Sequence, residues 1–138
     1  MAQPAFSDIW TAAGVILGFQ AAAFLWRIAN EVAYSRETKN RDVTWLPPAD
    51  LMNLVAMAVM VLGVFLGPLL PGATAAPQKW FGLALILFVG HCFALAGHYD
   101  LYNRKTSRSM LYFPLQEQIA VAVTLVFCVA YLALVFRA

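Results

Sequence analysis

Four long apolar stretches constrain this chain more than any other feature of its sequence. They cover residues 9–28, 51–70, 80–102 and 114–136. At a rise of 1.5 Å per residue, about 20 residues form a helix that crosses about 30 Å of hydrocarbon. Apolar and polar residues do not alternate in these stretches, as they do in barrel strands. The sequence therefore predicts an all-α integral membrane protein with four transmembrane helices in an antiparallel bundle.

Composition supports lipid as the solvent of these stretches. Of 138 residues, 62% are hydrophobic and 12% are charged, which is about half the charged share of an ordinary soluble domain. We expect one membrane domain, residues 1–138, with cytoplasmic loops at 29–50 and 103–113. A cleaved signal peptide is disfavoured because the only nearby basic residue, Arg27, follows the first apolar run. A formal charge of +2 without a basic aromatic tract argues against nucleic acid as a partner.

Basic residues near the ends of the stretches predict the orientation, because Lys and Arg resist translocation and stay in the cytoplasm. Two of the nine, Lys79 and Arg137, lie on one side. The other seven fall in the first and third connections: Arg27, Arg36, Lys39, Arg41, Arg104, Lys105 and Arg108. We therefore expect both termini to be extracytoplasmic in a plasma or inner membrane.

Polar residues inside the apolar stretches are the candidates for a functional site, because such groups are costly in lipid. Their positions predict two layers, one near the middle of the membrane and one nearer its inner surface. The middle layer holds Gln20, His91 and Thr124, and the inner layer holds Asn53, His98, Gln116, Glu117 and Gln118. Of these, Gln20, Asn53, His91, His98, Glu117 and Thr124 are candidates to line a pore or polar site. Interhelical hydrogen bonds worth about 1 kcal/mol each are the alternative role.

The two histidines are seven residues apart, which places them on one helix face about 10 Å apart. One mononuclear metal ion cannot bind both, and a bis-histidine haem would need a histidine from a second protomer. We predict no metal site and no catalytic residues, and we expect Cys92 and Cys128 to be buried free thiols. His98 should lie near Glu117 across a helical hairpin, forming a pair that responds to pH.

Small residues predict where helices approach most closely. Gly14, Gly18 and Ala22 recur every four residues, and so do Gly90 and Ala94. This spacing leaves a shallow groove that another backbone can enter. The first and third helices are therefore expected to form the closest contacts.

The stretch GHCFALAGHYDLYNRKTSR, residues 90–108, resembles the third helix and following loop of the membrane-associated glutathione and eicosanoid enzyme family. That resemblance implies four helices, external termini and a thiol cofactor. The second helix departs from the family pattern of Arg, Asn and Glu, since only Asn53 follows Asp50 before an apolar run. Small multidrug transporters also have four short helices, but no comparable glutamate lies within the first predicted span. We assign the chain to neither family.

The function expected from these features is that of a small polytopic membrane protein without enzymatic activity. It would act as a homo-oligomeric channel or transporter-like module, or as an accessory subunit of a larger membrane complex. One alternative is a membrane enzyme subunit that binds haem or a thiol cofactor. Another is a scaffold that recruits a partner through its cytoplasmic loops. No particular cofactor is predicted by the sequence.

Overall fold

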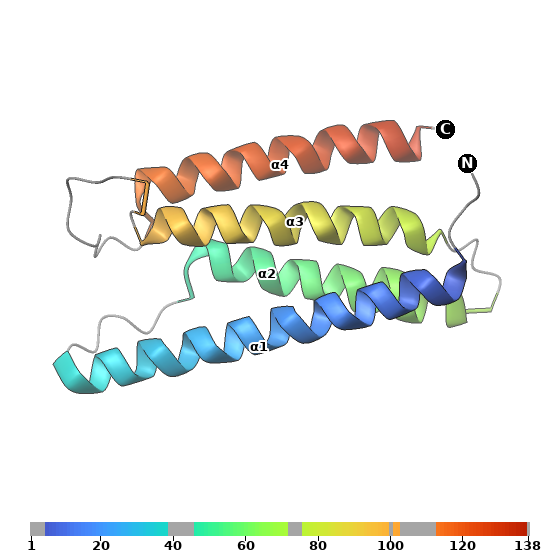
Figure 1. The fold of residues 1–138 in the computed structure, drawn as a ribbon. Coiled ribbons are helices and arrows are strands. Elements are labelled where there is room, and N and C mark those ends of the chain that lie inside the picture. Colours follow the sequence, from blue (N-terminus) through green and yellow to red (C-terminus); the bar gives the residue numbers. More distant parts are fainter. Residues whose placement is uncertain (1–4, 39–45, 72–75, 100, 103–112, 138) are drawn as a thin grey trace.

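A computed structural model describes residues 5–38, 46–71, 76–99, 101–102 and 113–137. All regular structure in these residues is helical. The elements are α1 (Phe6–Thr38), α2 (Pro48–Val59) with a π-helical continuation (Met60–Leu66) and a 3₁₀ turn (Gly67–Leu69), α3 (Pro77–His98) and α4 (Leu115–Phe136). The helices lie side by side, with α3 between α4 and α2 (Figure 1).

Four helices in the described residues are long and apolar enough to cross a membrane, which confirms the all-helical class and the four candidate spans. Their ends differ from the predicted ends. The first helix continues to Thr38, beyond its apolar run. The third ends at His98, because the chain then turns and the Leu101 amide donates to the Ala96 carbonyl at 3.0 Å. Much of both predicted inner loops, residues 39–45 and 103–112, lies outside the described residues.

One face of α1 packs on the other helices. Its buried residues are Ile9, Ala13, Gln20 and Arg27, whose spacings of four and seven keep them on one side of the helix. Ile9 and Ala13 contact a core that includes Met60 of the π-helical segment. The inward face of α1 is thus apolar over its first half and polar over its second, which places two polar side chains deep among the helices.

The predicted small-residue contacts occur on α3 and not on α1. A Cβ atom added at Gly90 would overlap the Thr124 side chain, so α3 and α4 meet closely there, and Ala94 is fully buried. Gly14, Gly18 and Ala22 are exposed, and nothing in the described residues lies within 4 Å of a Cβ built at either glycine. The expectation of a close contact along this face of α1 is therefore wrong within one chain.

The thiols also differ from expectation. Both cysteines are free, and Cys128 is buried as predicted, but Cys92 is exposed on the outer surface of α3. The helix turns Cys92 away from its buried neighbour His91 by about 100°. Burial of Cys92 was therefore a wrong prediction.

Candidate functional site

A buried ion cluster joins α1, α2 and the end of α3. The Arg27 side chain is 6% exposed, and its Nε atom lies 2.9 Å from Oδ2 of Asp50. Its Nη1 atom lies 2.7 Å from Oε1 of Glu31 and also donates to the Tyr99 hydroxyl. The same hydroxyl donates to Oε1 of Glu31 at 2.7 Å. One guanidinium therefore holds two carboxylates and a phenol, which is the kind of hydrogen-bonded pairing that a buried charge requires.

Local sequence explains how these side chains come together. Arg27 and Glu31 are four residues apart, so they lie on one face of α1. Pro47 and Pro48 begin α2, and they place Asp50 in its first turn, opposite Arg27. Tyr99 is the first residue after α3 and its ring also lies under the guanidinium, with 5.2 Å between Arg27 Cζ and the ring centroid.

A second polar group connects α4 to the start of α2. Glu117 is fully buried, and its Oε1 atom accepts a hydrogen bond of 2.8 Å from the backbone N–H of Ala49. Its Oε2 atom lies 2.8 Å from Nδ1 of His98. Gly97 makes this possible, because a Cβ added there would lie 2.7 Å from the backbone nitrogen of Glu117. The structure thus confirms the expected proximity of His98 and Glu117, while their pH response stays a prediction.

His91 links the two polar groups. Its Nδ1 atom lies 2.8 Å from the Ala49 carbonyl oxygen. A carbonyl oxygen can only accept, so Nδ1 carries the proton and Nε2 is the ring atom that can take up another. Ala49 also donates its N–H to Glu117, and the next residue along α2 is Asp50. His91 therefore stands between the ion cluster and the Glu117 group.

Gln20 lies about two helical turns before Arg27 on α1, and Asn53 lies about one turn after Asp50 on α2. Both are fully buried, and the Asn53 side-chain nitrogen is 3.4 Å from the Gln20 backbone oxygen. Both polar atoms of the Gln20 amide and the Oδ1 atom of Asn53 have no hydrogen-bond partner. Hydrogen bonds join the helices around Arg27 and Glu117, whereas these two amides keep polar atoms without a partner among the described residues.

A cleft of about 290 Å³ gives access to the ion cluster. It is lined by Ala23, Phe24, Trp26, Arg27, Asn30, Glu31, Asp50, His91, Leu95 and Tyr99. Charged groups and aromatic rings thus share one small space among α1, the start of α2 and the last turns of α3. Its volume is at the lower end of the range for small-molecule sites.

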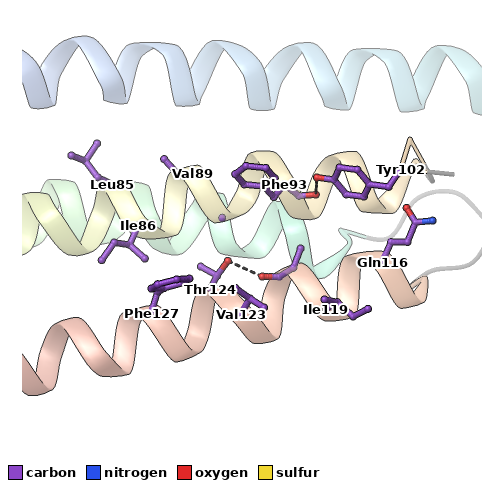
Figure 2. Close-up of a pocket in the computed structure, with 12 residues that line it drawn as sticks. Leu85, Ile86, Val89, Phe93, Tyr102, Gln116, Ile119, Val123, Thr124 and Phe127 are labelled. Atoms are coloured by element: carbon purple, nitrogen blue, oxygen red, sulfur yellow. Dashed lines mark hydrogen bonds between the residues drawn. The ribbon is translucent and has the colours of Figure 1, made fainter.

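Thr124 lies apart from this site. Its hydroxyl donates to the Ala120 carbonyl of its own helix at 2.8 Å. Figure 2 shows Thr124 at an apolar groove of about 690 Å³ between α3 and α4, with Tyr102 and Gln116 at one end and Leu85 and Phe127 toward the other. Within the described residues no hydrogen bond joins Gln20, His91 and Thr124, although Thr124 packs against Gly90, the residue before His91. The Gln20 backbone contacts Asn53, and the His91 side chain contacts Ala49.

Sequence reasoning did not include four residues of the ion cluster among its candidates: Arg27, Glu31, Asp50 and Tyr99. Arg27 was counted only for the orientation of the chain, and Asp50 was named only in the comparison with the glutathione and eicosanoid enzyme family. The sequence does contain a pattern that indicates this cluster. Arg27 and Glu31 are spaced i, i+4 at the end of the first apolar run, and Asp50 stands at the start of the second. Opposite charges at equal depth on neighbouring spans are expected to pair.

No group of three His, Cys, Asp or Glu side chains in the described residues could hold a metal ion. Comparison with protein-family models, curated proteins and solved structures finds no match to this chain. Function must therefore be argued from the charged cleft.

Proposed function

We propose that the chain is a small transporter-like module of the membrane that binds a small organic ammonium ion in the Arg27 cleft. In this proposal the four helices cross a plasma or inner membrane as an antiparallel bundle. The cleft opens toward the cytoplasm, where six further basic residues of the two inner connections are expected to remain. The leading observation is the charge balance of the cleft.

The charged side chains that line the cleft leave an excess of negative charge. Arg27 supplies one positive charge, whereas Glu31 and Asp50 supply two negative charges. Two carboxylates beside one guanidinium attract positive charge, so the cleft favours a cation or a proton. Phe24 and Trp26 add aromatic surface, which attracts ammonium groups.

His91 supplies the coupling between cation and proton in this mechanism. A proton on its Nε2 atom balances the excess charge when the cleft is empty. A bound ammonium ion balances the same charge, so the imidazolium releases that proton as the cation enters. The organic cation and the proton therefore compete for the cleft. Such competition is required for the exchange of one for the other.

Binding is tested by titrating the purified protein with tetramethylammonium in a calorimeter. We expect saturable binding that weakens at least about tenfold in Asp50→Asn and in Glu31→Gln, which is a loss of about 1.4 kcal/mol. Glu37→Gln is the matched control, because it removes a carboxylate from the exposed end of α1. Absence of binding to the wild type, or equal binding by all variants, contradicts the proposal.

Transport also requires a route through the outer half of the membrane. Beyond Gln20 and Asn53, the inward residues of α1 and of the second span are apolar, such as Ala13 and Val64. We propose that this route forms between protomers of a homo-oligomer and that the exposed Gly14 and Gly18 face of α1 meets another copy. Mass measurement of the detergent-solubilised particle tests this: we expect an oligomer that Gly14→Leu dissociates, and a wild-type monomer contradicts it.

A further inference from the structure

Three polar atoms without a hydrogen-bond partner in the described residues belong to Gln20 of α1 and Asn53 of α2, two residues that contact each other. They are Nε2 and Oε1 of Gln20 and Oδ1 of Asn53. Gln20 and Asn53 are both 0% exposed, so neither lipid head groups nor bulk water reach them. Buried polar groups in native proteins almost always have a hydrogen-bond partner, protein or water.

The unpaired set consists of two acceptors and one donor group. Oε1 of Gln20 and Oδ1 of Asn53 each need a donor, and the Gln20 amide nitrogen needs an acceptor. A water molecule offers two O–H donors and accepts at its oxygen. One water therefore satisfies all three atoms, and buried waters typically make about three such bonds.

A contact between the Asn53 side chain and the Gln20 backbone brings these two residues together. The Asn53 side-chain nitrogen lies 3.4 Å from the Gln20 backbone oxygen, so that nitrogen is already used and Oδ1 remains for another partner. A hydroxyl group has one donor and cannot serve both oxygens. An ammonium group has no acceptor for the amide N–H.

We infer that Gln20 and Asn53 bind one internal water molecule that bridges α1 and α2. This water site does not depend on the proposed cation function, because it follows from the unpaired amides alone. It would extend the hydrated part of the protein inward from Asp50 by about one helical turn, or about 5 Å.

A structure of the full chain at a resolution that reveals ordered water tests the inference. We expect one water within hydrogen-bonding distance, about 3.2 Å or less, of the three atoms. A direct hydrogen bond between the Gln20 and Asn53 side chains with no water would overturn it. Density for a larger molecule, such as a ligand carboxamide, would also overturn it.

Infrared difference spectroscopy on exchange from H₂¹⁶O to H₂¹⁸O gives an independent readout. A sharp O–H band that shifts with the isotope is expected in the wild type. The band should disappear in the Gln20→Met, Asn53→Leu double variant, which keeps side-chain volume, and should remain in Gln118→Met, which changes an exposed glutamine. A band that survives the double variant, or is absent from the wild type, contradicts a water held by these amides.

Discussion

Glu117 of α4 accepts a hydrogen bond of 2.8 Å from the backbone N–H of Ala49 at the start of α2. Pro47 and Pro48 precede this amide, so no side chain within α2 caps it. A carboxylate at a helix N-terminus is also favoured by the helix dipole. The two helices are thereby joined by a charged contact, although α3 forms most of the packing between them.

The first prediction concerns this contact. Glu117→Ala leaves the Ala49 amide and His98 without their partner, so we expect the free energy of unfolding to fall by about 2–4 kcal/mol. Glu117→Gln retains an acceptor for Ala49 and should lose about half as much. Unfolding of the detergent-solubilised protein monitored by circular dichroism measures both, and Gln118→Ala, on the exposed face, is the control. Equal stability of Glu117→Ala and the control would refute a capping role.

The second prediction concerns the ion cluster. Arg27→Gln leaves Asp50 buried without its main counter-charge, and we expect a loss of about 3–5 kcal/mol in unfolding free energy. Asp50→Asn in the same chain removes that unpaired charge. The double variant should therefore be more stable than Arg27→Gln alone, with a coupling of about 1–3 kcal/mol in a double-mutant cycle. Additive losses would mean that the two side chains act independently.

The third prediction concerns the close approach of α3 and α4. Gly90→Leu places side-chain atoms where Thr124 lies, so we expect a loss of about 1–3 kcal/mol of unfolding free energy from overpacking. Thr124→Gly should restore part of that loss in the double variant. Ala130→Leu is the control, because Ala130 is exposed on α4 and lies outside the Gly14 and Gly18 face. A Gly90→Leu protein as stable as the control contradicts the packing.

The fourth prediction concerns the pair of His98 and Glu117. Imidazole is the side chain that ordinarily changes charge between about pH 5 and pH 8. If the pair responds to pH, the midpoint of thermal unfolding should vary over this range in the wild type and vary less in His98→Ala. His98→Gln keeps a hydrogen-bond donor for Glu117 without the charge change, and it separates the two contributions. Identical pH profiles of the unfolding midpoint for the wild type and His98→Ala would contradict a pH response of this pair.

Much of the fold follows from the sequence, because lipid permits few arrangements of an apolar backbone. The four apolar stretches predict four helices, whereas the ends of these helices and the π-helical segment Met60–Leu66 of the second span differ from that prediction. The extension of α1 to Thr38 agrees with the mixed charges of residues 30–40, which predict about two further helical turns, whereas the early end of α3 depends on a backbone turn after His98. Helix ends depend on local hydrogen bonds that composition does not report.

The candidate site is predicted less completely. Glu117 and His98 could be paired from helix lengths, because a hairpin sets their relative depth. Arg27 and Asp50 could not be paired in the same way, because the connection between their helices is long and does not fix the rotation of α1. The direction in which Gly14 faces could not be predicted for the same reason. Spacing shows that small residues share a face of a helix, but it does not show which neighbour that face meets.

Flux in reconstituted liposomes tests the central claim of cation and proton exchange most directly. Vesicles that contain the protein and an internal pH dye are placed in a gradient of tetramethylammonium, which does not cross lipid alone. We predict a change in internal pH that follows the gradient, persists in Glu37→Gln and is lost in Asp50→Asn. An internal pH that matches protein-free vesicles under the same gradient would contradict the account.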